Sequence, residues 1–266
     1  MVMNNIDKRL EELKMRKRIG LMTHVVIGYP SLKETVSLVK VMAEAGVDFV
    51  ELQIPFSDPL ADGATIMKAC EASLANGTKV TDAFAVMQEL SSLVMMPLLF
   101  MAYYNTVFAY GIEKFCRDAK KAGASGLIVP DMPIDEEEYE HFYTFAKKYG
   151  LHTIHVMSPA STENRLRKNA KVAKGFVYCT ARQGITGAQK ELNPSIRTYL
   201  TKVKSIFFLP IAVGFGISRR EHINALEGIA DIVIVGSAII DIIAHSSKKD
   251  RLQKITDFIS SLKMLK

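Results

Sequence analysis

Two kinds of hydrophobic pattern alternate along the chain. Short runs of apolar, largely β-branched residues are typical of strands buried on both faces. Eight such runs occur, at residues 21–27, 48–54, 97–102, 126–129, 153–157, 175–179, 209–213 and 231–235. Between them, apolar residues return every three or four positions, which predicts amphipathic helices. This helical spacing is clearest at residues 32–45, 112–122, 135–149 and 195–204.

The alternation of strands and helices predicts an α/β protein with a parallel sheet. Because the units follow one another without a break in composition, we expect one domain over residues 1–266, closed into a (β/α)8 TIM barrel. An open doubly wound sheet is the alternative. Charged residues, glycines and prolines gather just after the strands, where the loops of a barrel meet on one face. An extra N-terminal helix, over residues 6–15, is expected to cover the opposite end.

Composition narrows the class of protein. Of the 266 residues, 48% are hydrophobic and 23% are charged, which is typical of a globular protein. Basic and acidic residues are interspersed, so the net charge of +6 indicates solvated helix faces rather than a nucleic-acid surface. No apolar run is long enough for a membrane span, and the charged N-terminus does not resemble a signal peptide. The three widely separated cysteines predict free thiols without a metal site, as in a reducing cytoplasm.

Glycine-rich segments follow the last two predicted strands. Gly214-Phe215-Gly216-Ile217-Ser218 follows the seventh strand, and Gly236-Ser237 follows the eighth and begins a helical pattern. Glycine lets the backbone approach an oxyanion closely, and the start of a helix presents free N–H groups. In barrels, these two loops frequently bind phosphate. The alternative, glycines needed only for tight turns, is weaker for two adjacent loops than for one.

Two carboxylates follow the second predicted strand. Glu51 lies between apolar residues near the end of that strand, where burial disfavours its charged form and suits a group that both takes and gives protons. The alternative for Glu51 is a salt bridge to a neighbouring strand. Asp62 lies on a proline-stiffened loop. From the sequence alone, we interpret it as the cap of a helix that begins near Gly63.

The segment from Glu51 to Gly63 resembles the signature of tryptophan synthase α subunits. That signature reads Glu-Leu-Gly-hydrophobic-Pro-Phe-Ser-Asp-Pro-Leu-Ala-Asp-Gly, and this chain departs from it once, at Gln53. The resemblance extends over nearly the whole chain. Its other parts are segments 28–30, 103–105, 130–133, 184–187, 214–218 and 236–237, with Tyr178 and Arg182.

Other departures from the family pattern adjoin the same region. Thr23-His24 stands where the family usually has proline followed by an aromatic residue, and Ala64 replaces a proline. His24 would therefore approach the pocket in which the family binds the indole ring of its substrate. We interpret it as a core histidine with one satisfied hydrogen bond rather than a catalytic group, and we give His155 a structural role as well.

The resemblance implies a carbon–carbon lyase of tryptophan biosynthesis, which cleaves indole-3-glycerol phosphate into indole and glyceraldehyde 3-phosphate by retro-aldol chemistry. By resemblance, Glu51 is the acid–base, Asp62 accepts the indole N–H, and Tyr178 orients Glu51 or the substrate, unless it is only a core tyrosine. Thr186, on a mobile loop, would bond Asp62. The residues implied to bind the indole ring or the phosphate are Met101, Ile128, Val129, Val156, Thr186, Gly187, Phe215, Gly216, Gly236 and Ser237.

The resemblance also implies a partner. Family α subunits pass indole to a pyridoxal-phosphate-dependent β subunit in an α2β2 heterotetramer, so we expect that cofactor on the partner and none in this chain. Residues 55–62 and the loops of Asn105 and Pro133 fall at the family's contact surface. Three alternatives remain: another phosphate-binding barrel of aromatic biosynthesis, a non-catalytic activator of a β subunit, and a stand-alone lyase. The first should lack the Glu51–Asp62 pair and the second should have lost one of the two carboxylates, but this chain keeps both, and the third would share every catalytic residue.

Overall fold

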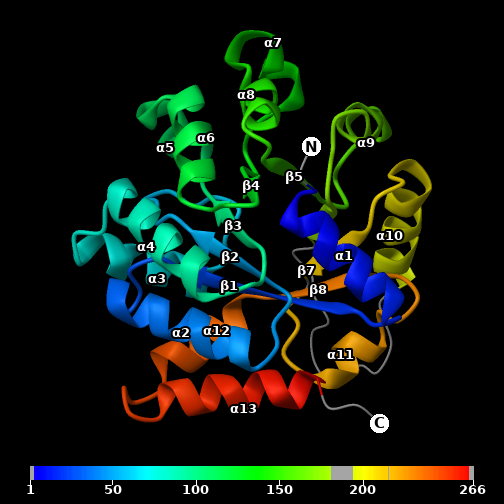
Figure 1. Ribbon diagram of the computed structural model, residues 1–266. Helices are drawn as coiled ribbons and strands as arrows, with labels where there is room; N and C mark the ends of the chain where they lie inside the picture. Colours follow the sequence, from blue (N-terminus) through cyan, green and yellow to red (C-terminus); the bar gives the residue numbers. More distant parts are fainter. Residues whose placement is uncertain (1–2, 181–193, 215, 264–266) are drawn as a thin grey trace.

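The strands of the computed structural model form a closed barrel (Figure 1). The structure describes residues 3–180, 194–214 and 216–263. Within them, eight parallel strands pair in sequence order and β1 also pairs with β8, which confirms the predicted barrel and excludes an open sheet. The strands are β1 (Gly20–Val26), β2 (Phe49–Gln53), β3 (Leu98–Met101), β4 (Gly126–Ile128), β5 (His152–Met157), β6 (Val177–Thr180), β7 (Ile211–Gly214) and β8 (Ile232–Val235).

Helices surround the barrel (Figure 1). Three of them, α2, α6 and α10, match predicted helices closely. In the described part of the chain, no helix is both long and apolar enough to cross a membrane. The helices are α1 (Asn5–Met15), α2 (Leu32–Glu44), α3 (Ala64–Ala75), α4 (Val80–Leu93), α5 (Tyr104–Tyr110), α6 (Ile112–Lys121), η1 (Ile134–Glu136), α7 (Glu137–Glu140), α8 (Phe142–Lys148), α9 (Glu163–Ala170), α10 (Pro194–Ile206), α11 (Arg220–Asn224), α12 (Ser237–Ala244) and α13 (Arg251–Lys263).

Strand residues point alternately into the barrel and out toward the helices. The outward residues form a large apolar layer beneath the helices. The inward residues fill the barrel, and among them the rings of Phe49 and Phe176 meet edge to face with centroids 5.8 Å apart. This interior cluster consists of Ile6, Leu13, Met22, Phe49, Leu99, Met101, Tyr103, Ile128, Ile154, Phe176, Ala212, Ile232 and Ile234.

The extra helix α1 lies at the amino-terminal end of the barrel, as predicted (Figure 1). Its Ile6 and Leu13 are buried in the interior cluster. Asn4, its N-cap, donates to the carbonyl oxygens of Ser125 and Gly150 at the start of the neighbouring strands. Helix α1 therefore closes this end with apolar side chains, and the open end of the barrel is the carboxyl end.

The single helix predicted over residues 135–149 is wrong, because the segment folds as η1, α7 and α8. His141 interrupts it with a left-handed backbone at φ +54°. The Glu137 carboxylate accepts hydrogen bonds from the backbone N–H groups of Tyr143 and Thr144, both at 2.8 Å. These two bonds satisfy N–H groups that a new helix start leaves free. The apolar spacing continues through the break, so the pattern alone predicted one helix.

Replacing Ile6 with alanine should lower the free energy of unfolding by about 2–4 kcal/mol, because it leaves a cavity in a packed interior. Ile6 is 0% exposed. Urea titration followed by circular dichroism measures the change. Lys8→Ala, at an exposed position of the same helix, is the matched control and should change stability by less than about 0.5 kcal/mol. Similar small effects of both substitutions would contradict the role of α1 as a plug.

Candidate active site

Alternation along the strands brings polar inward residues together at the carboxyl end of the barrel. His24 of β1 lies beside Glu51 of β2 in the strand register. Gln53 follows two positions later on the same side of β2, and Tyr178 packs against the interior cluster from β6. These four side chains continue the inward columns of strands whose earlier positions are apolar. The packed apolar side chains near the start of the strands therefore determine where along the barrel axis the polar side chains begin.

Glu51 is almost completely buried, 2% exposed, and is hydrogen-bonded from two sides. Its Oε1 lies 2.8 Å from His24 Nδ1 and accepts a hydrogen bond of 3.3 Å from the Tyr178 hydroxyl. The alternative role foreseen for Glu51, an ion pair to a neighbouring strand, is therefore present, but its partner is a buried histidine. His24 does have the one hydrogen bond expected of a core histidine. That bond goes to the candidate catalytic carboxylate.

The charges in this cluster favour a protonated His24 and a neutral Tyr178. Burial disfavours a charged imidazole, but the charge and hydrogen bond of Glu51, with a smaller contribution from Asp62, outweigh it and raise the pKa of His24 above 6.5. Burial, and then the charges of Glu51 and Asp62, raise the pKa of Tyr178 well above 10. Tyr178 therefore remains a hydrogen-bond donor to Glu51 throughout the physiological pH range.

Asp62 lies on the loop between β2 and α3, where it is tied to the barrel. Its Oδ2 accepts hydrogen bonds from Gln53 Nε2 at 2.7 Å and from the Tyr103 hydroxyl at 2.9 Å. The same hydroxyl accepts one from the backbone N–H of Ala61 at 3.0 Å. Gly63 is the N-cap of α3 and makes no side-chain capping bond. The predicted capping role of Asp62 is therefore wrong, and its carboxylate belongs to the site.

Apolar side chains line the interior beside the two carboxylates. Met101 of β3 and Ile128 of β4 belong to the interior cluster, and Val156 of β5 and Phe56 pack against it. The first three are brought together as expected from the sequence. Val129 is not, because it belongs to the outer layer beneath the helices. Neighbouring residues of a strand face opposite sides, so Ile128 and Val129 could not both face the pocket.

The glycine-rich ends of β7 and β8 adjoin this group. A Cβ added to Gly214 would lie 3.3 Å from the Tyr178 hydroxyl oxygen, so glycine leaves room for that ring. Gly216 has φ +68° and open space beside it, and Gly236 caps α12, whose first residue, Ser237, is exposed. Three further predicted site residues lie outside the described residues: Thr186, Gly187 and Phe215.

Three contacts of the site were not anticipated. Two are the bonds of Gln53 and Tyr103 to Asp62, and the third is the bond of His24 to Glu51. Tyr103 follows Met101 by two positions, so the alternation of β3 could have indicated that it faces inward. The bond between His24 and Glu51 depends on the register of β1 against β2, for which the sequence offers no local signal.

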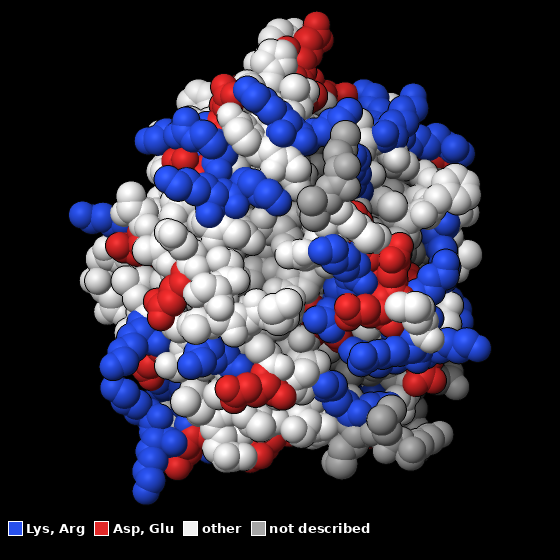
Figure 2. Space-filling view, in the orientation of Figure 1, with Lys and Arg blue, Asp and Glu red and all other residues white. Residues whose placement is uncertain are grey.

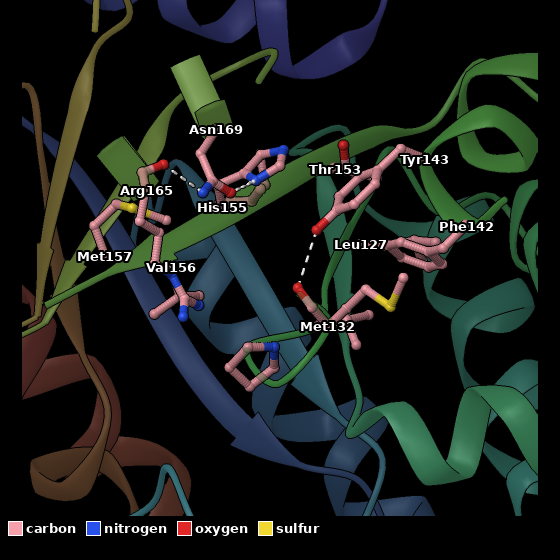
Figure 3. A pocket seen from close by; sticks show the side chains of 13 residues that line it. Leu127, Met132, Phe142, Tyr143, Thr153, His155, Val156, Met157, Arg165 and Asn169 are labelled. Carbon is pink, nitrogen blue, oxygen red and sulfur yellow. Dashed lines mark hydrogen bonds between the residues drawn. The ribbon is translucent and has the colours of Figure 1, made fainter. Parts of the chain in front are cut away.

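A second buried histidine lies between β5 and helices α8 and α9, on the outer side of the barrel (Figure 3). His155 Nδ1 is 2.6 Å from Asn169 Oδ1, and its ring stacks on Tyr143 with centroids 5.0 Å apart. Burial lowers the pKa of His155 to about 4, so this ring is neutral. The cavity beside it measures about 10 Å³, room for no more than a single water molecule. Its role is structural, as predicted.

The surface charge seen in Figure 2 and the potential metal ligands of the described residues do not indicate a second site. On the face seen in Figure 2, basic and acidic side chains are interspersed. The described residues contain no cluster of three or more His, Cys, Asp or Glu that could hold a metal ion. The three cysteines are free and buried, as predicted.

Barrel enzymes carry their chemistry on the loops that follow the strands, and here both carboxylates lie at that end. Glu51 is buried at the end of β2, and Asp62 is held on the following loop. Apolar walls next to them suit an aromatic or aliphatic group. Fold and site together define the class: a (β/α)8-barrel enzyme equipped for acid–base chemistry on a largely apolar substrate.

Comparison with known proteins identifies the family. The tryptophan synthase alpha chain family model matches residues 10–266. Tryptophan synthase alpha chains from Desulfotalea psychrophila and Thermoanaerobacter sp. are 42% and 40% identical over 97% and 98% of this chain, and each alignment covers 99% of the relative. The crystal structure of tryptophan synthase subunit alpha from Legionella pneumophila has a TM-score of 0.89 at 33% identity and covers 98% of this chain and 97% of that one. The chain belongs to the tryptophan synthase alpha chain family.

The reaction expected from the sequence follows from this membership. The chain is a carbon–carbon lyase of tryptophan biosynthesis, and it cleaves indole-3-glycerol phosphate into indole and glyceraldehyde 3-phosphate. The alternative of a different phosphate-binding barrel is thereby excluded.

Proposed function

We propose that Glu51 moves the proton in this cleavage. Breaking the bond between indole C3 and the glycerol side chain requires that C3 gain a proton and that the hydroxyl on the adjacent carbon lose one. The observation that supports Glu51 is its position, buried at the carboxyl end of the barrel with Oε1 held by His24 and Tyr178. Because both contacts use Oε1, we assign Oε2 to the substrate.

The electrons move in two steps. Glu51 first gives its proton to C3, and the ring supplies the electron pair, so that positive charge develops on the indole nitrogen. Glu51 then takes the hydroxyl proton. The O–H electron pair forms the aldehyde carbonyl, the pair of the breaking carbon–carbon bond returns to the ring, and the nitrogen charge is neutralised.

Asp62 and Tyr178 support these steps in different ways. Asp62 would accept the indole N–H and stabilise the positive charge on the ring, which is stabilisation directed at the transition state. Gln53 and Tyr103 hold its Oδ2, so Oδ1 is the oxygen we assign to the substrate. Tyr178 keeps Glu51 in place as a permanent donor.

The remaining predicted residues would bind the two ends of the substrate. The interior side chains of Met101, Ile128 and Val156 offer an apolar wall for the indole ring, and Phe215 is assigned to the same pocket. The open side of Gly216 and the start of α12 suit the phosphate, because glycine permits a close approach and a helix start favours anions. We assign phosphate binding to Gly187, Gly216, Gly236 and Ser237. We assign to Thr186 a hydrogen bond with Asp62.

We further propose that the chain works with a tryptophan synthase β subunit, which carries pyridoxal phosphate, in a cytoplasmic α2β2 assembly. A chain of the crystal structure of tryptophan synthase from M. tuberculosis, aminoacrylate-bound form, has a TM-score of 0.86 at 28% identity and covers 98% of both chains. The segments after β2, β3 and β4 each expose a large apolar side chain: Leu60, on the loop before α3, is 84% exposed, Phe108 in α5 is 58% exposed and Tyr139 in α7 is 74% exposed. All three segments follow strands and so belong to the carboxyl end of the barrel, where exposed apolar groups suit an interaction surface. Contact there would reach the loop that carries Asp62.

Glu51→Gln should abolish cleavage and leave substrate affinity within about threefold of wild type, because it removes proton transfer but nearly keeps side-chain shape. Steady-state turnover and equilibrium binding, measured together, test this. Glu44→Gln, at an exposed position near the end of α2, is the matched control and should leave turnover unchanged. More than roughly a tenth of wild-type turnover in Glu51→Gln would exclude it as the principal acid–base, given the usual ~10²–10⁴-fold contribution.

Ser237→Asp should weaken binding of glycerol 3-phosphate by about tenfold or more, because it places a negative charge against the anion at the start of α12. Calorimetric titration measures the affinity. Ser260→Asp adds the same charge at an exposed position of α13 and should have little effect. Equal affinities in the two variants would place the phosphate elsewhere.

Addition of a tryptophan synthase β subunit should raise indole-forming turnover at saturating substrate, because partner contact favours a closed site. Leu60→Ser should weaken the complex in analytical ultracentrifugation, whereas Phe208→Ser should not. Phe208 is 99% exposed but lies before β7, at the other end of the barrel. Equal turnover with and without the β subunit, and no complex by sedimentation, would indicate a stand-alone lyase.

A further inference from the structure

Two buried polar atoms in the site have no hydrogen-bond partner among the described residues. They are His24 Nε2 and Gln53 Oε1. Both belong to residues at which the chain departs from its family's usual sequence. His24 is bonded through its other nitrogen to Glu51, and Gln53 through its amide nitrogen to Asp62. Each of the two departures is therefore hydrogen-bonded to one of the two carboxylates.

We propose that His24 is a positioning residue for Glu51 and that the two side chains share one exchangeable proton during the cleavage. The proposal rests on the role of Glu51 proposed above. The 2.8 Å separation of His24 Nδ1 and Glu51 Oε1 is a hydrogen bond across which a proton can move. Both side chains are at most 4% exposed, so water cannot easily supply that proton instead.

The surroundings of the ring favour such sharing. The ionisable groups that face His24 are Glu51 from β2, Asp62 from the following loop and, beyond Glu51, Tyr178 from β6. From the α12 side it meets Gly236, whose added Cβ would lie 3.5 Å from the His24 Cβ. Gln53 also favours the protonated ring, as expected if its amide oxygen faces Nε2. A protonated ring can thus donate from both nitrogens, whereas a neutral one cannot.

His155 shows that burial alone does not produce this behaviour. It too lies on an apolar strand, but a neutral amide is its partner and burial lowers its pKa to about 4. His24 has a carboxylate partner, and its pKa is raised instead. The difference between the two histidines is the charge of the group they touch.

The shared proton balances the reaction. The pair holds one dissociable proton, which the charge and hydrogen bond of Glu51 favour on the His24 ring. That proton passes from Nδ1 to Oε1 of Glu51, and rotation of the carboxyl group, in which Oε1 and Oε2 exchange places, presents it to indole C3. When the carbon–carbon bond breaks, Glu51 takes the hydroxyl proton, and the pair recovers the proton it gave. Nothing is oxidised or reduced, and no further reactant is needed.

A pH profile distinguishes sharing from simple packing. Two groups that share one proton lose it with an apparent pKa at least as high as that of either group alone. In His24→Phe, which keeps an aromatic ring, the descending limb of the kcat profile should therefore move to lower pH by about one unit or more, with KM changed less than about threefold. At a pH above the limb, this shift corresponds to a kcat lower by about tenfold.

Two further variants complete the test. His24→Asn keeps an N–H donor for Glu51 but cannot titrate, so the descending limb of its kcat profile should stay at the low pH of His24→Phe.

His152→Phe is the matched control, because His152 also bonds a carboxylate at 2.8 Å, that of Asp7, but at the opposite end of the barrel. Its profile should match wild type. NMR titration of the His24 ring should give a pKa above 6.5 that falls in Glu51→Gln, a readout independent of turnover.

An unmoved limb in His24→Phe, or a limb restored in His24→Asn, would overturn proton sharing. So would a His24 ring whose titration is unaffected by Glu51→Gln. Failure of the proposed function is a different result: Glu51→Gln would retain turnover, whatever the His24 variants do.

Discussion

A carboxylate inside a packed barrel must keep hydrogen-bond donors, because burying its charge without them costs several kcal/mol. Glu51 meets this requirement with His24 on one side and Tyr178 on the other. The second carboxylate, Asp62, is tied down by Gln53 and Tyr103. The site is therefore a set of donors arranged around two charges, and it can exist only where the strands end and the apolar filling stops.

The apolar filling determines where this boundary lies. Helix α1 and the inward phenylalanines close the amino-terminal half of the barrel and leave the carboxyl end open. At the next inward position after Phe49 and Phe176, the same columns carry Glu51 and Tyr178. Rigid strands position these groups, while the loops beyond them carry Asp62 and the glycine-rich segments. This arrangement combines proton-transfer groups on the strands with binding groups on the loops that follow them.

Strand alternation and helical spacing were sufficient to predict the eight strands, the plug helix and the face of the site, because burial on two sides leaves a strong apolar signal. Glu51 and Tyr178 could be assigned through family resemblance. The break at His141 could not, since it depends on a side chain capping the next helix. The bonds of His24 and Gln53 also depend on register and loop path, which only the folded barrel defines. The sequence placed His24 near the indole pocket and marked Gln53 as a departure from the family signature, but it predicted neither bond.

The central claim is that Glu51 carries a proton to and from indole C3. Hydrogen exchange tests it most directly: the chain is incubated with indole in heavy water, and deuterium at C3 is followed by NMR. The account predicts that the wild-type chain catalyses this exchange and that Glu51→Gln, although it still binds indole, does not. Exchange at the wild-type rate in Glu51→Gln would show that another group protonates C3 and would contradict the account.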